Sequence, residues 1–189
     1  MVSGTGSNML TLLEKLKNEP LINFALIISN IPSSPGLKKA QQLGYNCEVL
    51  RDRKNIDNFE HCLHKLLLKE NIQLICLAGF MKILSPSFIG NWKNRILNIH
   101  PSLLPKFKGL NTHSRVLESG DKIHGCTVHY VNERLDDGKI LAQRTVEVTR
   151  NDNSATLANK VLIEEHKLYS KVVRNIVIKE NKFLTSSSF

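Results

Sequence analysis

Asn98 and His100 lie two residues apart in a short apolar run at residues 96–100 that is typical of a β-strand. Side chains alternate across a strand, so the amide and the imidazole project from the same face. A proline follows the run and ends it, which puts both groups at the carboxyl edge of the predicted sheet, where open α/β folds bind ligands. A buried polar pair with a structural role is the alternative. The proline-rich loop at 101–109 and the acidic turn at 136–138 favour a site for chemistry.

A glycine-containing loop opens the chain with the sequence Ser3-Gly-Thr-Gly-Ser-Asn8. An amphipathic helix is predicted to follow it, and glycines at a helix start let backbone N–H groups approach an anion. The spacing differs from that of the Walker A loop, and Met9 stands where a dinucleotide fingerprint has its third glycine. We therefore expect a single phosphate rather than ATP or NAD. The residues alone leave open that Ser7 only caps the helix.

Glu165 occupies the apolar stripe of the predicted C-terminal helix, between Val161 and Tyr169. A carboxylate on a buried face needs a partner. It can pair with a basic side chain in the core or accept a hydrogen bond from a ligand amine, and the sequence leaves both open. His61 and His64, on another predicted helix, lack a third ligand at a recognisable spacing, so we expect no metal site.

The elements that would position these residues alternate between strands and helices. Short apolar runs rich in β-branched residues occur at residues 24–29, 72–79 and 96–100. Segments with a period of about 3.6 residues separate them, which predicts an α/β fold with a Rossmann-like, doubly wound, mostly parallel twisted sheet and helices on both faces. After Gly120, extended runs at 122–131 and 139–148 predict an antiparallel addition, and a helical pattern from 153 to 178 closes the chain.

Length and composition bound the class of protein. The 189 residues, 41% hydrophobic and 23% charged, exclude a disordered or collagen-like chain and suit one domain over residues 1–189. The 26 basic and 17 acidic residues give a net charge of +9, which is compatible with nucleic acid, anionic lipid or a small polyanionic substrate. Basic and aromatic residues do not alternate as they do in a nucleic-acid stacking surface.

The cysteines and the apolar runs indicate a compartment. The 4 cysteines have irregular spacing without a C-x-x-C pair, so we expect reduced core residues of a cytoplasmic protein. The amino-terminal residues do not have the pattern of a signal peptide, and no apolar run approaches the ~20 residues that span a bilayer. We therefore expect neither secretion nor membrane insertion.

Taken together, the motifs resemble those of a known family. They are Ser3-Gly-Thr-Gly-Ser-Asn8, Leu77-Ala-Gly-Phe-Met-Lys-Ile-Leu-Ser-Pro86, Asn98-Ile-His-Pro-Ser-Leu-Leu-Pro-Lys106, Gly109-Leu-Asn-Thr-His113, His124-Gly125 and Leu135-Asp136. The central block is typical of folate-dependent formyl transferases, and the first loop narrows the resemblance to the phosphoribosylglycinamide formyltransferase family. The resemblance covers almost the whole chain.

The resemblance implies an activity and three catalytic residues. Asn98, His100 and Asp136 would catalyse formyl transfer from 10-formyltetrahydrofolate to the amine of 5-phosphoribosylglycinamide, a step in purine synthesis. Asn98 and a protonated His100 would stabilise the oxyanion, because donors aimed at that oxygen lower the barrier. Asp136 would favour the imidazolium and help to move the proton.

The resemblance also assigns binding residues and the two halves of the domain. The phosphoribosyl substrate is expected at Gly4, Thr5, Gly6, Ser7, Asn8 and Glu165. The folate is expected at Met81, Lys82, Ile83, Leu84 and Asn98, between walls formed by Leu77, Leu97 and Val131. Residues 1–110 would form the phosphate-binding, Rossmann-like half, and residues 111–189 the folate-side strands and the closing helix.

The chain departs from the family pattern at three places. The family has several more residues before the Ser3 loop, which form a central first strand, so we expect a truncated or misassigned start and a loss of stability. Ile56 stands where many members carry an arginine that contacts the folate tail, a role for which Arg53 or Lys54 is a candidate. Asp137 replaces a common glycine or serine and adds a charge beside Asp136.

Four other functions are the alternatives. Methionyl-tRNA formyltransferase and formyltetrahydrofolate deformylase share the central block, but each resembles a longer chain with a further domain. A basic nucleic-acid-binding module and an inactive, folate-binding scaffold are the alternatives without catalysis. Both small substrates are anionic, which accounts for part of the charge of +9 without nucleic acid or membrane. We expect the glycinamide reaction, carried out by a monomer or a weak homodimer.

Overall fold

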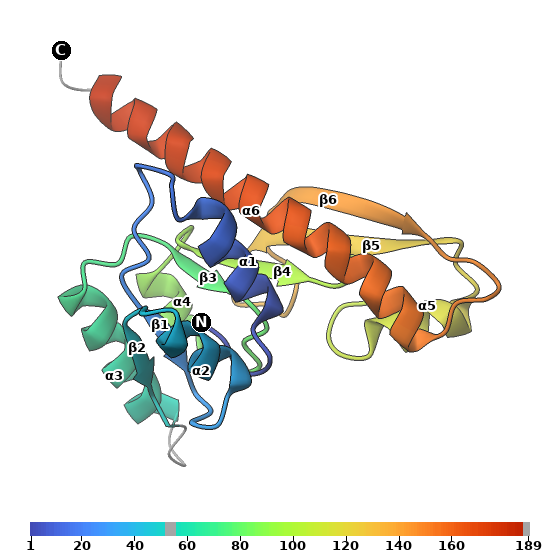
Figure 1. The fold of residues 1–189 in the computed structure, drawn as a ribbon, viewed down its shortest axis with the longest axis horizontal. Coiled ribbons are helices and arrows are strands. Elements are labelled where there is room, and N and C mark those ends of the chain that lie inside the picture. Colours follow the sequence, from blue (N-terminus) through green and yellow to red (C-terminus); the bar gives the residue numbers. More distant parts are fainter. Residues whose placement is uncertain (52–55, 187–189) are drawn as a thin grey trace.

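The computed structural model describes residues 1–51 and 56–186, and a twisted sheet runs through its centre (Figure 1). The strands are β1 (Ile27–Ser29), β2 (Cys47–Val49), β3 (Ile75–Leu77), β4 (Ile96–His100), β5 (Ile123–Tyr130) and β6 (Ile140–Glu147). β1 pairs with β2 in parallel, and β3 pairs with β4 in parallel. β5 pairs antiparallel with both β4 and β6. The predicted α/β fold, parallel first and antiparallel after residue 120, is confirmed.

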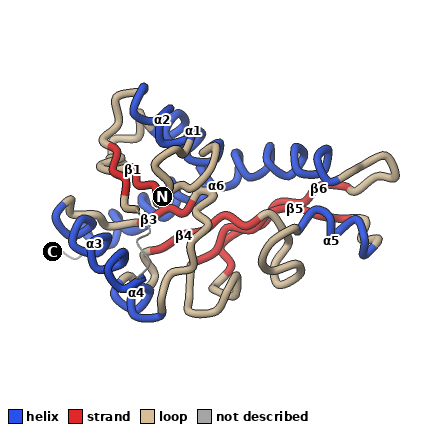
Figure 2. The backbone as a smooth tube through the Cα atoms, turned by 90° about the horizontal axis from the view of Figure 1, so that it is seen from below, coloured by secondary structure: helices blue, strands red, loops and turns tan. Residues whose placement is uncertain are grey.

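Helices cover both faces of the sheet, as predicted. They are α1 (Ser7–Leu16), α2 (Pro35–Gln42), α3 (Ile56–Lys69), α4 (Pro86–Asn91), α5 (Thr112–Ser119) and α6 (Ser154–Ser186). Figure 2 shows α1, α2 and α6 on one side of the strands and α3 and α4 on the other. α2 and α4 each begin after a serine cap, Ser34 and Ser85, with proline as the first helical residue, an arrangement that favours a helix start.

Neighbouring residues of β4 pack into two different hydrophobic clusters. Ile96 packs with Trp92 in the cluster beneath α3 and α4. Leu97 packs with Tyr169 in the cluster beneath α1 and α6. This alternation is the reason that Asn98 and His100 share one face, as the sequence predicts. It also makes Leu97 a completely buried core residue.

The strands form two sheets, which are divided between β1 and β3. Among the described residues, backbone hydrogen bonds of Met1, Val2 and Ser3 bridge the two sheets. The N–H of Val2 donates to the carbonyl of Ile28 at 2.9 Å, and the N–H of Ala78 donates to the carbonyl of Met1 at 3.0 Å. Beyond Met1 lies a cavity of about 800 Å³, lined by residues that include 21–28 and 70–76. The strands predicted at 24–29 and 72–79 therefore form only next to a pairing neighbour, at 27–29 and 75–77.

Met1 is one of the residues that line this cavity, and its amino group makes a hydrogen bond with β3. It donates to the carbonyl of Cys76 at 2.6 Å. Burial lowers the pKa of this amino group to about 6, because a charged ammonium loses its hydration there.

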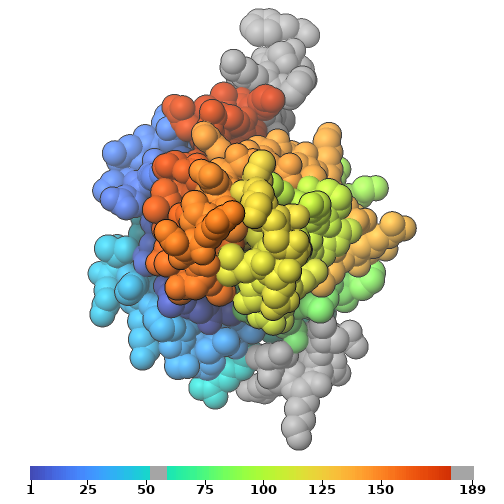
Figure 3. All heavy atoms as spheres, turned by 90° about the vertical axis from the view of Figure 1, so that its right-hand side faces the viewer, coloured from blue at the N-terminus to red at the C-terminus, as the bar shows by residue number. Residues whose placement is uncertain are grey.

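α6 is longer than the sequence predicts. The apolar stripe ends near Ile176, but no glycine or proline follows, and the helix continues to Ser186. At its other end α6 packs against α5, where the hydroxyl of Ser114 donates to that of Ser154 at 3.3 Å. Figure 3 shows this end of the molecule, with the α5 region in yellow beside the start of α6 in orange.

Two further expectations concern cysteines and membranes. The 4 cysteines are free thiols in the structure, as expected, and Cys126 is buried. Cys62 is exposed on α3, so its expected place in the core is wrong: it lies on the outer face of an amphipathic helix. Within residues 1–51 and 56–186, no helix combines the length and the apolar character that crossing a membrane requires.

Candidate active site

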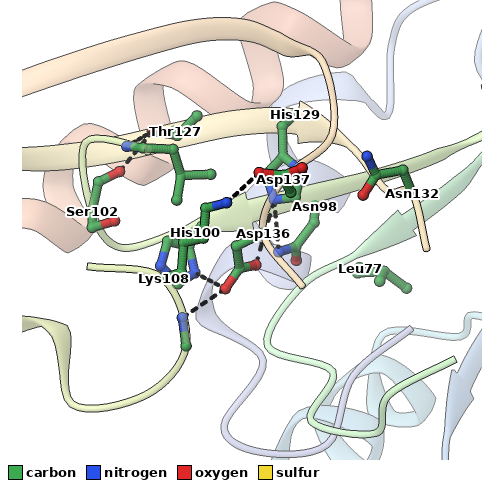
Figure 4. A network of polar contacts seen from close by, with 12 residues as sticks. Leu77, Asn98, His100, Ser102, Lys108, Thr127, His129, Asn132, Asp136 and Asp137 are labelled. Atoms are coloured by element: carbon green, nitrogen blue, oxygen red, sulfur yellow. Dashed lines mark hydrogen bonds and ion pairs between the residues drawn. The ribbon is translucent and has the colours of Figure 1, made fainter. Parts of the chain in front are cut away.

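Four side chains from three elements form a polar cluster, Asn98, His100, His129 and Asp136 (Figure 4). We call this cluster the reaction centre because it contains the three residues that are predicted to be catalytic. Asn98 and His100 come from β4, His129 from β5 and Asp136 from the connection to β6. Nδ1 of His100 lies 3.3 Å from Oδ2 of Asp136, and Nε2 of His129 lies 3.7 Å from Oδ1. The amide nitrogen of Asn98 lies 3.3 Å from Nε2 of His129. The structure thus brings together the three residues that the sequence singles out.

His129 is the member of the reaction centre that the sequence reasoning missed. Its Nδ1 lies 2.8 Å from the carbonyl of Tyr130, and because a carbonyl only accepts, Nδ1 carries the proton. Burial lowers the pKa of His129, against the opposing effects of the Tyr130 carbonyl and of Asp136. Nε2 is then free to accept from the amide of Asn98. His129 therefore orients Asn98, and the cross-strand pairing of the two residues was the signal that could have found it.

His100 faces an acceptor with each ring nitrogen. Nε2 lies 3.0 Å from the carbonyl of Phe107, opposite the contact with Asp136. Phe107 sits in the proline-rich loop and has a positive φ of 55°, a conformation that is uncommon for a residue with a side chain. A doubly protonated ring satisfies both neighbours at once. The loop thereby presents a backbone carbonyl to the ring nitrogen that lies opposite Asp136.

A buried polar group beneath this loop fixes its path. The hydroxyl of Thr127 donates to the carbonyl of Ser102 at 2.6 Å and accepts from the N–H of Leu104 at 3.1 Å. The amide of Gln143 donates to the carbonyl of Leu104 at 2.9 Å. Each of these backbone groups of the loop has a hydrogen-bond partner on β5 or β6, so the loop is held in one position against these two strands.

Asp136 is held by a tight turn of the backbone. It is 9% exposed, has a positive φ of 49°, and accepts from the N–H of Gly109 at 2.9 Å. Gly138 is required two residues later, because a Cβ there would lie 1.7 Å from the carbonyl oxygen of Tyr130. The acidic turn predicted from the sequence therefore aims its first carboxylate at His100.

Asp137, the extra charge in this turn, is paired away from the reaction centre. Its carboxylate contacts the ammonium of Lys108 and lies 3.7 Å from the guanidinium of Arg134. The hydrogen bond from Lys108 lowers the pKa of Asp137. Because a cation neutralises it at the surface, Asp137 does not place a second free carboxylate beside His100.

The glycine loop is packed against the first turn of α2. Gly6 is the N-cap of α1 with a φ of 74°, and its ideal Cβ would lie 2.8 Å from Cα of Gly36. The hydroxyl of Ser34 and the N–H of Gly36 both donate to the carbonyl of Gly4. Ser7 is the first helical residue rather than the cap, so the alternative in which Ser7 only caps the helix is wrong. The close approach of Gly6 to Gly36 explains why the N-cap position is occupied by a glycine.

A cavity of about 250 Å³ opens at the start of α1. It is lined by Ser3, Gly4, Thr5, Gly6, Ser7, Asn8, Ile31, Ala78, Gly79 and Met81. The first α-helical hydrogen bond runs from Leu10 to the carbonyl of Gly6, so the N–H groups of residues 7–9 precede the helical ladder. N–H groups outside the helical ladder and the positive end of the helix dipole make this cavity suited to an anion.

Glu165 reaches this region from α6, and we call it and residues 3–8 the phosphate-side pocket. Oε2 of Glu165 accepts from the amide of Asn8 at 2.8 Å. Burial raises the pKa of Glu165 to about 7, against the opposing effect of Asn8. The amide oxygen of Asn8 is buried without a hydrogen-bond partner among the residues described. In the structure the partner of Glu165 is the side-chain amide of Asn8, which is neither the basic side chain nor the ligand amine that the sequence left open. The pocket keeps the amide oxygen of Asn8 as an acceptor for a ligand.

Residues 80–85, which we call the 80–85 loop, form the second part of the connection between β3 and α4 and include the positions at which the folate is expected. Met81 and Ile83 are 63% and 71% exposed, whereas Leu84 and Leu77 are buried. Val131 is half-buried and packs against the same cluster as Leu77. The loop therefore presents two apolar side chains to solvent above a buried apolar base, and Leu97 lies apart from it in the other cluster.

The remaining candidates take structural positions. His64 accepts from the indole of Trp92 at 3.1 Å, and His61 is exposed. In residues 1–51 and 56–186 no group of three or more His, Cys, Asp or Glu side chains is arranged to hold a metal. Arg53 and Lys54 lie outside the described residues.

Comparison with known proteins assigns this arrangement to a family. A family model described as formyl transferase matches residues 1–173. The chain is 42% identical over 173 residues to the trifunctional purine biosynthetic protein adenosine-3 of Homo sapiens, covering 89% of this chain and 17% of that protein. It spans less than a fifth of the length of each trifunctional relative that we compared.

Single-function bacterial proteins match over most of their length. Phosphoribosylglycinamide formyltransferase of Escherichia coli (strain K12) is 36% identical over 177 residues, covering 92% of this chain and 83% of that protein. The crystal structure of phosphoribosylglycinamide formyltransferase from Brucella melitensis has a TM-score of 0.88 and 40% identity, covering 93% of this chain and 92% of that one. The chain therefore belongs to the formyl transferase family of enzymes.

Proposed function

We propose that this enzyme transfers the formyl group of 10-formyltetrahydrofolate to the amine of 5-phosphoribosylglycinamide in purine synthesis. The pairing of Asp136 with His100 beside Asn98 carries the proposal. The names of the similar proteins from Escherichia coli and Brucella melitensis support the choice of acceptor. The glycine loop beside Glu165 supports it independently, because it suits a substrate with both a phosphate and an amine.

The reacting groups need donors aimed at one oxygen. The amine nitrogen bonds to the formyl carbon, and negative charge develops on the formyl oxygen. Asn98, oriented by His129, has a second amide hydrogen to give to that oxygen. A protonated His100 supplies positive charge, and Asp136 balances that charge. Catalysis in this proposal comes from donors that are in place before the charge appears.

The proton follows a path through His100 and Asp136. As the tetrahedral intermediate collapses, the bond between the formyl carbon and N10 breaks, and N10 gains the proton that the amine loses. Asp136 and His100 form a relay with a separation of 3.3 Å that can accept and return this proton. The products are the formylated amine and tetrahydrofolate, so atoms and charge balance without a metal or redox group.

The two ends of the phosphoribosyl substrate would bind at different parts of the phosphate-side pocket. Backbone N–H groups at Gly6, Ser7 and Asn8 suit the phosphate, with Gly4 and Thr5 exposed beside them. Glu165 and the amide oxygen of Asn8 are acceptors that suit the amine or ribose hydroxyls. A donor-rich ligand would satisfy both acceptors and remove the cost of leaving them buried.

The folate would bind along the 80–85 loop. Backbone groups of Met81, Lys82, Ile83 and Leu84 would hydrogen-bond the pterin, with Leu77 and Val131 as apolar walls. The exposed side chains of Met81 and Ile83 would then be covered by the ligand. Asn98 would lie between the pterin and the acceptor amine.

A steady-state assay with three acceptors tests the proposal. Purified chain is given 10-formyltetrahydrofolate with 5-phosphoribosylglycinamide, with methionyl-tRNA, or with water alone, and tetrahydrofolate release is followed. We expect turnover that depends on 5-phosphoribosylglycinamide. Turnover with methionyl-tRNA or water only would assign the chain to one of the related reactions. Folate binding without any turnover would indicate an inactive, folate-binding relative.

A further inference from the structure

Side chains of other elements fasten the 80–85 loop at both ends. At its start, the hydroxyl of Ser3 accepts from the N–H of Met81 at 2.9 Å. At its end, Glu60 of α3 accepts from the N–H of Ser85 at 2.6 Å and from the hydroxyl of the same residue. The segment between these anchors includes the two exposed apolar side chains described above.

Glu60 is unusual for a glutamate because it is buried, with 7% of its surface exposed. A carboxylate that is removed from water costs free energy unless donors meet both oxygens. Ser85 meets one oxygen with its N–H and the other with its hydroxyl. The hydroxyl of Ser85 also accepts from the N–H of Phe88 at 3.2 Å, as the cap of α4. One buried carboxylate thus fixes the point where the loop ends and α4 begins.

The same turn of α3 makes two further contacts with the loop. The ring of Phe59 stacks on Phe80 with a centroid distance of 6.5 Å and an interplanar angle of 19°. The ammonium of Lys82 lies 5.2 Å from the centroid of the Phe59 ring, within the range of a cation–π contact. Phe59 therefore supports the loop from below, and Glu60 fixes its end.

We propose that Glu60 is a positioning residue for the formyl donor, which it serves by holding the 80–85 loop in a donor-binding shape. The inference rests on the proposed function, in which this loop binds the pterin. Glu60 acts through Ser85 and has no contact with the reaction centre among the hydrogen bonds of the described residues. Its removal should weaken folate binding and leave the phosphate-side pocket unchanged.

Binding and kinetics of Glu60→Gln and Glu60→Ala test this inference. Tetrahydrofolate binding is measured by calorimetry, and KM is measured for each substrate. For Glu60→Ala we expect Kd for tetrahydrofolate and KM for the formyl donor to rise about tenfold, as for a lost hydrogen bond to a charged group. Glu60→Gln should show a smaller rise, because its amide oxygen still accepts from Ser85. KM for 5-phosphoribosylglycinamide and kcat should change by less than about twofold.

Two control variants separate positioning from stability. Glu70→Gln removes a carboxylate just beyond the other end of α3 and should leave both KM values unchanged. Ser85→Ala should raise the donor KM, and adding Glu60→Gln to it should cost less than the sum of the two single changes. A purely structural role predicts a lower Tm with no selective effect on the folate.

Several results would overturn the inference. They are an unchanged Kd for tetrahydrofolate in folded Glu60→Gln and Glu60→Ala, equal rises in both KM values, or additive effects of the Glu60 and Ser85 changes. If Glu60→Ala does not fold, Glu60→Gln decides alone. A chain that binds tetrahydrofolate but transfers no formyl group contradicts the proposed function, whereas the comparison of Kd values still tests Glu60. A wild-type chain that binds no tetrahydrofolate contradicts both.

Discussion

The reaction centre and the phosphate-side pocket are built in opposite ways. In the reaction centre, both ring nitrogens of His100 and of His129 face protein partners, and Asp136 accepts from Gly109. In the pocket, the amide oxygen of Asn8 is buried without a partner among the described residues, and burial raises the pKa of Glu165 to about 7. The polar groups named in the reaction centre have protein partners without a ligand, whereas the pocket contains a buried acceptor that lacks one.

The difference suits two kinds of work. Charge that develops during a reaction is stabilised best by groups that are already oriented, because they need no reorganisation at that moment. A binding pocket instead gains affinity from acceptors that only the ligand satisfies. Changes in the reaction centre should therefore alter kcat, and changes in the pocket should alter stability and substrate affinity.

The largest effect is expected from Asn98→Ala and His100→Ala. Each removes one group that stabilises the charge on the formyl oxygen in the proposed mechanism, so kcat should fall by roughly 10²–10³. Stopped-flow or steady-state rates, with circular dichroism to check the fold, measure this. A folded variant of either kind with nearly the wild-type kcat would show that the assigned role is wrong.

Glu165→Gln should change the pH dependence of stability. A native pKa of about 7, raised from 4.5, means that wild-type stability falls as pH rises from about 4.5 to 7. The variant lacks this loss, so it should be more stable than wild type at pH 8, by up to about 3 kcal/mol, and the gain should vanish near pH 4.5. Urea unfolding at several pH values measures the difference.

Glu164→Gln is the matched control, because the neighbouring Glu164 is paired with Lys167 at 2.6 Å. It should show no gain at pH 8. If Glu165→Gln and wild type have parallel stability curves from pH 4.5 to 8, the carboxylate is not protonated in the native pocket. Weaker binding of 5-phosphoribosylglycinamide by Glu165→Gln would link the same group to the substrate.

Gly6→Ala should distort the glycine loop. The positive φ and the close approach to Gly36 leave no room for a Cβ, so we expect a loss of about 2 kcal/mol and a higher KM for the phosphoribosyl substrate. Gly44→Ala has a similar φ of 82° with no atom near its Cβ, and it isolates the cost of the backbone conformation. Equal losses of stability in the two variants would show that the contact with Gly36 is unimportant.

The smallest effect is expected from Lys108→Gln. This change breaks the ion pair between Lys108 and Asp137. Asp137 follows Asp136 in the sequence, but its side chain lies at the surface. Exposed ion pairs contribute little, so kcat should change by less than about twofold. A much larger loss would mean that the charge of Asp137, once unpaired, reaches His100.

Local patterns were enough to predict most of the elements and part of the site. The alternation in residues 96–100 predicts the shared face of Asn98 and His100, and the helical stripe identifies Glu165. The structure confirms both placements. These features depend only on residues that are close along the chain, where the period of a strand or helix determines the direction of each side chain.

Other features depend on partners that are distant in sequence. His129 joins the reaction centre because β5 pairs with β4 in a register that brings it opposite Asn98. The strands predicted at 24–29 and 72–79 are shorter in the structure because β1 and β3 do not pair with each other, and in the described part of the chain a three-residue segment, Met1, Val2 and Ser3, lies between them. Neither the register of two strands nor the identity of a pairing neighbour can be predicted from the local sequence pattern.

Asp136→Asn, measured in a single turnover, tests the central claim most directly. Enzyme in excess over 10-formyltetrahydrofolate, with saturating 5-phosphoribosylglycinamide, reports the chemical step alone, and calorimetry gives Kd for each substrate. If Asp136 acts on His100 within a prebuilt centre, the rate should fall by roughly 10²–10³ while both Kd values stay within about twofold of wild type. A folded Asp136→Asn enzyme that transfers the formyl group at nearly the wild-type rate would contradict the account.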